Sequence, residues 1–418
     1  MEQRQTTEPA TVTTTEFGSD AVKSLSRAVR RAVGRESAAV GTEHLLHSLL
    51  SDTEEPGSAL VPGGRESSTI CGHIRARDER HWARDDSGRT APAEGTDDTD
   101  TDSADGPHAL DDAHEVDAVW REAVWIVSQS DRSLREEDAR APEPSGALRL
   151  TLLGALRLAR EEGAHDVHER HLARALLETP GSRALEALSL RRVDVAAAAS
   201  ALDTQAEAVR AGAEPWPAEA EAVLGSVKLL RGARLLGERG VWWTRGMMSW
   251  MARTAGDGSP LVLVISNQAQ RQAVRHGRTE TEPVDLLLAV MAVDRALTVA
   301  GVSLPEELLV VNSAADTLRS AGIRQADLVR AATAAAEPPA RYAVPGDVDR
   351  SAETDKVVAS ARLLAAERRD ETAGTAHVLI ALLDAPEGPA AQLLRECGAD
   401  PAALRTRLDA SLGATPAA

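Results

Sequence analysis

The chain has 418 residues, enough for two or three domains that each bury a core. Hydrophobic residues make up 43% of it but aromatic residues only 2%, so Ala, Leu and Val must fill the interior, and Ala and Leu favour helices. The formal net charge of −18 argues against nucleic acid as a partner, because binding to phosphates needs Lys and Arg.

Cysteine usage and hydropathy indicate a cytoplasmic protein without a membrane anchor. Cys71 and Cys397 are too few for a disulfide framework or a four-ligand zinc site. The first residues are polar, with neither the basic nor the apolar region of a signal peptide. No apolar run approaches the roughly 20 residues that span a bilayer. Association with a membrane is therefore not expected.

Polar and proline-rich segments divide the chain. Residues 1–15 are rich in Thr and are expected to be disordered. A second polar segment covers about residues 63–114. Between Arg89 and Arg121 the chain has ten acidic residues and no basic one, which predicts a flexible acidic insertion. Proline-rich breaks follow at residues 142–144, 215–217 and 338–345.

One short amphipathic pattern recurs along the chain. In the stretch that starts at Thr42, apolar residues follow three, four, seven and eight positions later, which places them on one face of a short helix. We expect the Thr42 hydroxyl to cap this helix by accepting a hydrogen bond from a backbone N–H. The same spacing starts at Glu169, Pro283 and Thr375, and in a degenerate form at Thr244.

The flanks of these copies also agree. A longer apolar-faced segment precedes three of them, at residues 21–33, 148–159 and 357–365. A turn with Pro or Gly, a short helix and a closing helix follow. One such unit cannot bury its apolar stripe alone, so we predict an all-α fold of tandem, pseudo-twofold four-helix repeats. The predicted parts are a module at 16–205 that contains the acidic insertion, a linker at 206–216, and a module at 217–415 with a degenerate repeat at about 217–262.

At the first and last copies the sequence resembles the amino-terminal repeat (Clp R, or Clp N) domain of the Clp ATPases. Each repeat of that family has a segment close to Gly-Thr-Glu-His-Leu-Leu. Residues 41–46 match this segment letter for letter, and residues 374–377 match it except at the Glu. The other copies keep the apolar spacing but not the letters. In all, the resemblance covers about three-quarters of the chain.

The resemblance implies a protein-binding module. In that family the domain docks substrates, adaptor proteins and some peptide antibiotics for an attached AAA+ unfoldase. The matching residues Thr42, Glu43, His44, Thr375 and His377 are therefore candidate contacts for a peptide or partner.

The resemblance also raises the question of phosphorylated arginine, which the Glu of each repeat helps to hold in some family members. Here only Glu43 occupies that position. The other clear copies carry Arg170, Val284 and Ala376 instead. A phosphoarginine site built on two such glutamates is therefore not expected.

The motor of that family requires a phosphate-cradling G-x-x-x-x-G-K-[S/T] loop. None of the three lysines, Lys23, Lys228 and Lys356, lies in such a loop. We therefore predict a non-catalytic adaptor, decoy or regulator of a Clp chaperone-protease, whose partners are a Clp ATPase, its substrates or its adaptors. The alternative is sequestration of a Clp-directed peptide antibiotic or another small molecule.

Residue types that carry chemistry are present without a catalytic arrangement. His44, His171 and His377 recur at equivalent places, but each lies in a separate repeat, so we expect a structural role and no metal site. No G-x-S-x-G motif follows a strand pattern. We therefore expect neither enzymatic activity nor a cofactor.

The most distinctive stretch is residues 241–251 (VWWTRGMMSWM), which holds three of the seven Trp and three of the five Met. The Met positions favour the core of the degenerate repeat. An adaptable partner surface and a membrane-surface helix are the open alternatives. Trp242 and Trp243 lie off the apolar face, so they are further candidates for binding. The apolar run Leu261–Ile265 is expected to be buried helix or a segment leading into one.

Overall fold

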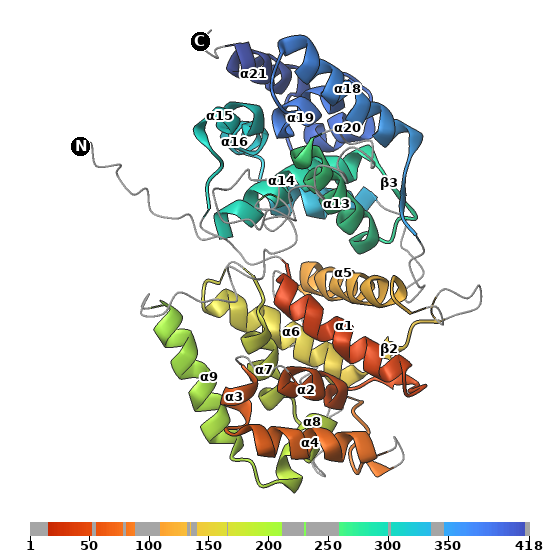
Figure 1. Ribbon diagram of the computed structural model, residues 1–418, viewed down its shortest axis with the longest axis vertical. Coiled ribbons are helices and arrows are strands. Elements are labelled where there is room, and N and C mark those ends of the chain that lie inside the picture. Colours follow the sequence, from red (N-terminus) through yellow and green to blue (C-terminus); the bar gives the residue numbers. More distant parts are fainter. Residues whose placement is uncertain are drawn as a thin grey trace, which may run out of the picture. The chain divides into compact units, whose positions relative to one another are not determined.

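The protein is described by a computed structural model, and its described residues are mostly helical (Figure 1). The all-α prediction is therefore confirmed. The structure describes residues 16–51, 56–77, 81–87, 109–131, 134, 140–164, 166–210, 230, 259–299, 302–335 and 347–413. The chain divides into two compact units, the first made of residues 1–134 and 138–218 and the second of residues 135–137 and 219–418.

The first unit contains two sets of helices. The first set comprises α1 (Ser19–Val33), β1 (Ala39–Val40), α2 (Thr42–Ser51), α3 (Gly57–Leu60) and α4 (Gly64–Ala76). The second set comprises β2 (Glu143–Pro144), α6 (Gly146–Glu161), α7 (Glu169–Glu178), α8 (Arg183–Leu190) and α9 (Val195–Arg210). A further helix, α5 (Ala109–Ser128), packs against α1 and α6, the long helices of the two sets.

The second unit repeats this order of elements. The third set comprises α13 (Pro260–Arg275), β3 (Glu280–Thr281), α14 (Pro283–Val299), α15 (Glu306–Leu309), the 3-10 helix η3 (Val310–Asn312), α16 (Ala314–Ser320) and α17 (Gln325–Ala335). The fourth set comprises β4 (Asp349–Arg350), α18 (Ala352–Arg368), α19 (Thr375–Leu383), α20 (Pro389–Glu396) and α21 (Pro401–Gly413).

The four clear copies of the apolar spacing all form helices that begin where the spacing predicts. These helices, which we call the short helices, are α2, α7, α14 and α19, and they start at Thr42, Glu169, Pro283 and Thr375. The prediction of a short helix is wrong for α14, which has 17 residues against 16 in α13. The degenerate copy at Thr244 lies outside the described residues. The run Leu261–Ile265 forms the start of α13 and is entirely buried, so the prediction of buried helix is confirmed.

The short helices lie at the centre of each unit. In α2 every residue from Thr42 to Leu50 is buried, and in α19 every residue is buried. The sequence pattern predicted that only one face of each helix is buried, but α2 and α19 are buried on all faces. The reason is that each short helix packs against the long helix of its own set and against the other short helix of its unit, α2 against α7 and α14 against α19.

Short parallel pairings join the sets within each unit. β1 pairs with β2, with Ala39 opposite Glu143, and β3 pairs with β4, with Glu280 opposite Asp349. An isolated parallel bridge joins Phe17, before α1, to Val167, before α7. In the first unit, the segment before each long helix thus pairs with the segment before the short helix of the other set. The pairing of the two sets is therefore reciprocal.

The turn before each closing helix contains one residue in the left-handed backbone conformation. These residues are Gly63, Arg192, Gly322 and Gly398, with φ of 106°, 54°, 83° and 83°. Glycine is the usual residue there because it has no Cβ to clash in this conformation. The first, third and fourth sets follow that rule, and the second set, with Arg192, does not.

The prediction of a disordered insertion at about 63–114 is wrong over much of its length. Residues Gly64–Ala76 form α4, which buries Ile70, Cys71 and Ile74, and α5 begins at Ala109. Residues 81–87, which we call the anchor loop, are also described. The local composition was polar, but a few apolar side chains at helical spacing are enough to hold α4 against α2. Residues 88–108 and the predicted tail at 1–15 lie outside the described residues.

Helix α9 runs to Arg210, into the predicted linker at 206–216. Leu230, within the predicted degenerate repeat, is buried in the core of the second unit. None of the helices in the described part of the chain is long and apolar enough to cross a bilayer.

Candidate functional site

The start of each short helix is held by the side chain of the third helical residue. Three histidines, His44, His171 and His377, accept a hydrogen bond at Nδ1 from the backbone N–H three residues earlier, at 3.0, 2.8 and 3.1 Å. In α14 the Asp285 carboxylate does the same for the N–H of Glu282, at 2.9 Å. Each contact satisfies a backbone donor that a helix start would otherwise leave without a partner.

The other ring nitrogen of two histidines contacts the loop before the helix. Nε2 of His171 lies 3.0 Å from Oε2 of Glu162, and Nε2 of His377 lies 2.9 Å from Oδ2 of Asp370. Because Nδ1 accepts, the proton is on Nε2, which donates to the carboxylate, and the ring is neutral. Burial lowers the pKa of His171 to about 4 and also lowers the pKa of His377. These histidines therefore act as structural clamps, as the sequence predicted.

The third set reverses the polarity of this clamp, since Asp285 accepts from Nη1 of Arg278 at 2.5 Å. We expect His377→Asp alone to lower the unfolding free energy of the second unit by about 2–3 kcal/mol, because the new carboxylate would face Asp370. Adding Asp370→Arg should recover most of this loss by recreating the pair of the third set. Urea denaturation of both single variants and the double variant checks this; simple additivity of the two effects would contradict a direct clamp.

Asp86 of the anchor loop lies at the centre of a polar cluster at the start of α2. It is 1% exposed. Its carboxylate accepts from the backbone N–H groups of Thr42 and Arg183, each at 2.9 Å, and from the hydroxyls of Thr42 and Ser145. One carboxylate thus serves the starts of α2, α6 and α8. The Thr42 hydroxyl donates to Asp86 and accepts from the N–H of Ala184 at 3.1 Å, so its predicted capping of α2 is wrong.

Glu43 follows Thr42 in α2 and is also buried. Its Oε1 accepts from Nη1 of Arg183 at 2.9 Å, and its Oε2 has no hydrogen-bond partner among the described residues. Burial raises the pKa of Glu43 to about 7 against the effect of Arg183, and Asp86 adds to the increase. One of the two buried carboxylate oxygens is thus already paired with Arg183. The geometry therefore gives Glu43 an internal arginine as its partner.

A second carboxylate fixes the anchor loop from α8. Glu186 accepts from the backbone N–H groups of Ala83 and Arg84, at 3.2 and 2.9 Å. It also accepts from Nη1 of Arg77 at 2.6 Å, and the same guanidinium lies 5.0 Å from the centroid of the Trp82 ring. The loop is thus held by charge, hydrogen bonds and a cation–π contact.

The remaining candidate residues divide between the buried and the undescribed parts of the chain. Thr375 is buried, and its backbone N–H donates to Oδ1 of Asn312 in η3 at 3.1 Å. Trp242 and Trp243 lie outside the described residues. The candidates in α2 and α19 surround helix starts with little exposed surface, and their contact with a partner stays a prediction. Across the ranges the structure covers, no group of three or more His, Cys, Asp or Glu is placed to hold a metal ion.

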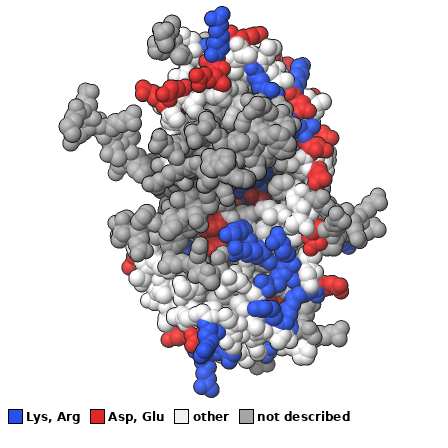
Figure 2. All heavy atoms as spheres, in the orientation of Figure 1, with Lys and Arg blue, Asp and Glu red and all other residues white. Residues whose placement is uncertain are grey.

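Basic side chains gather on α1, on the face of the first unit that Figure 2 shows. The helix carries Lys23, Arg27, Arg30 and Arg31, in contrast to the negative charge of the whole chain. Arg31 contacts Nε2 of His47 at 2.7 Å, and Arg30 donates to the Ser130 hydroxyl at 3.1 Å. Part of this basic stripe therefore serves contacts within the unit.

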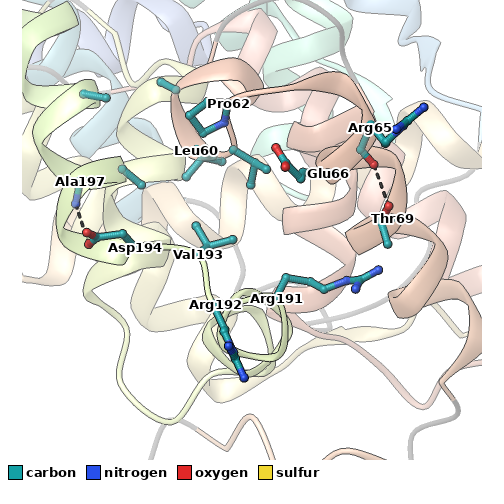
Figure 3. Close-up of a pocket in the computed structure, with 14 residues that line it drawn as sticks. Leu60, Pro62, Arg65, Glu66, Thr69, Arg191, Arg192, Val193, Asp194 and Ala197 are labelled. Carbon is teal, nitrogen blue, oxygen red and sulfur yellow. Dashed lines mark hydrogen bonds between the residues drawn. The ribbon is translucent and has the colours of Figure 1, made fainter.

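A cavity of about 550 Å3 opens between the two helix sets of the first unit (Figure 3). Leu60 at the end of α3 and Val193 before α9 contribute to its apolar lining. Three arginines also line it, Arg65 in the first turn of α4 and Arg191 and Arg192 in the turn between α8 and α9. Its size lies in the range of roughly 300–1,000 Å3 that is typical of ligand pockets.

Sequence reasoning missed Asp86, Glu186 and the arginines of the cavity. A signal for the anchor loop was available, because Trp82 is a large side chain in an otherwise polar segment. No comparable signal marks the cavity, which forms only when two segments more than a hundred residues apart come together.

The profile of the Clp repeat (R) N-terminal domain family matches residues 350–418. The match contains Arg350 of β4 and all of helices α18 to α21. It supports a Clp-related protein-interaction module in this part of the chain. None of the curated proteins matches the chain.

Proposed function

We propose that the chain is a non-catalytic, Clp-type binding protein that acts as an adaptor, decoy or regulator of a Clp chaperone-protease. The observation that carries the proposal is the family match over the fourth set. The other three sets share its design: a first helix, a second, largely buried helix clamped by its third residue, and a left-handed turn before the closing helix. That shared design supports a binding role for both units.

The proposal is tested by interaction with the Clp machinery itself. The full chain, immobilised for biolayer interferometry, should bind a purified Clp ATPase or one of the client proteins of that ATPase. A degradation assay with the same client then separates the roles, since an adaptor raises the rate of degradation and a decoy lowers it. The same ATPase without its own amino-terminal domain is the matched control. If the chain binds neither the ATPase nor the client, the proposal is wrong.

A second candidate function is sequestration of a peptide antibiotic or other small molecule, and the cavity of about 550 Å3 favours it. A bound ligand would stabilise the folded first unit by mass action. Clp-directed cyclic peptides should then raise the melting temperature of the first unit in thermal-shift measurements. No shift with any of these peptides would remove this alternative.

A further inference from the structure

The mouth of the cavity in the first unit has an excess of positive charge. Arg65, Arg191 and Arg192 are all exposed there. The acidic residues of the lining are Glu66 and Asp194, and Oδ1 of Asp194 already accepts from the backbone N–H groups at the start of α9, at 3.0 Å. In Figure 3, Arg65 points away at the upper right, Arg192 points downward below the cavity, and Arg191 extends to the right between them. An acidic segment would therefore meet arginines on both sides of the opening.

The floor of the same cavity is apolar and small. Leu60, Val61 and Ala198 are buried, and Val193 and Ala201 are half-buried. Such a lining admits one or two apolar side chains but offers no buried charge for a polar ligand.

Arg192 occupies a backbone position that two other sets give to glycine. It has φ of 54°, as against 83° for Gly322 and Gly398 in the turns before α17 and α21. The same hydrogen bond closes all three turns, from the residue after the left-handed one to a carbonyl five residues earlier, at 3.1, 3.0 and 2.9 Å. Neither glycine would meet another atom if it gained a Cβ, so only the backbone conformation favours glycine. The second set has an arginine at this position despite this preference.

A left-handed residue other than glycine does not by itself mark a binding site. Glu36 and Arg369 also adopt this conformation, in the turns after α1 and α18. Arg192 differs from both because it lines a cavity beside two other arginines.

We propose that this cavity binds a peptide segment of a partner protein, which inserts an apolar side chain between α3 and α9 and places acidic residues against the arginines on either side. This proposal rests on the proposed binding function and names the chemistry of the partner. The apolar floor accounts for the anchor, and the excess of arginine accounts for the acidic flanks.

A selection from a randomised, phage-displayed heptapeptide library on the full chain tests the proposal. Enriched peptides should contain Leu, Ile, Val or Met flanked by Asp or Glu, and their Kd should rise with salt. Arg192→Gly should raise the Kd of a synthesised peptide about threefold, the usual size for one exposed charge pair. The same change combined with Arg65→Gln and Arg191→Gln should raise it at least tenfold. Ala197→Phe, which fills the cavity from an exposed position, should abolish binding.

Arg192→Gly separates binding from folding, because it should leave the melting temperature of the first unit unchanged or up to about 3 °C higher. Arg369→Gly is the matched control. It should leave the melting temperature of the second unit unchanged or slightly higher, and it should not change the Kd of the peptide. Selection of no peptide, peptides without acidic residues, or equal affinity for the triple variant would overturn the proposal. Binding of the Clp ATPase separates the two proposals. If one of these outcomes occurs and the unchanged chain and the triple variant bind the ATPase equally well, the cavity proposal fails and the proposed function stands.

Discussion

Replacing Asp86 with Ala is expected to lower the unfolding free energy of the first unit by about 3–5 kcal/mol. The carboxylate accepts the backbone N–H groups of Thr42 and Arg183 and the hydroxyls of Thr42 and Ser145. Without it, these donors stay buried with no acceptor, and three helix starts lose the same negative charge. Calorimetry of the full chain should show the first unit melting earlier. Hydrogen exchange should become faster at the starts of α2, α6 and α8.

Two control variants separate the carboxylate from the backbone of the loop. Asp86 has φ of 59°, which glycine adopts without strain, so Asp86→Gly should cost about as much as Asp86→Ala if the carboxylate is decisive. Asp85→Ala removes a neighbouring exposed carboxylate that accepts from the N–H of Ser87 at 3.0 Å, and it should leave the stability of the first unit nearly unchanged. An Asp86→Ala protein as stable as the unchanged chain would contradict the anchoring role.

Acidification from pH 7 to pH 4.5 is expected to destabilise the first unit by an amount on the order of 4 kcal/mol, and the second unit much less. Burial, with nearby arginines, lowers the pKa of His44 to about 3 and the pKa of His47 to about 4. Burial also lowers the pKa of His171 to about 4. In the unfolded chain a histidine binds its proton near pH 6.5, so the unfolded state takes up protons first. Each neutral histidine therefore contributes its full amount to the unfolding free energy above pH 6.5. This contribution is lost as the pH falls from there toward the pKa of the folded state.

An opposite contribution comes from Glu43, whose pKa is raised to about 7 by burial. Its folded form binds a proton before the unfolded form does, so acidification relieves a cost of about 3 kcal/mol. Over the same pH range the contribution of each of the three histidines to the unfolding free energy falls by about 2–3 kcal/mol. Their combined loss is larger than the gain from Glu43. In the second unit His377 has a lowered pKa, while burial raises the pKa of Asp285 to about 7, and the two effects oppose each other.

Urea denaturation at several pH values checks the expected acid sensitivity. Hydrogen exchange at the same pH values shows how much of the change belongs to each unit. His171→Asn is the informative variant. Its side chain can still accept from the N–H of His168 but does not titrate, so about 2–3 kcal/mol of the pH dependence should disappear. Equal losses in both units, or a flat response of the first unit, would contradict these assignments.

The amino-acid sequence by itself determined the fold class and the starts of four short helices. Apolar spacing and helix-start residues act over three to eight positions, so the signals at Thr42, Glu169, Pro283 and Thr375 could be recognised locally. The structural role expected for His44, His171 and His377 follows the same logic, since each bonds a backbone N–H only three residues away. Local chemistry was enough at these positions.

Only the tertiary structure decided how the first unit is held together and where its cavity lies. Asp86 bonds partners 44, 59 and 97 residues away, and its own neighbours in the sequence are polar and acidic, which locally indicates disorder. The cavity joins the turn after α3 to the turn before α9, far apart in the chain. The physical reason is the same in both cases: a buried carboxylate and an apolar cavity arise only when helices that are distant in the sequence share one core.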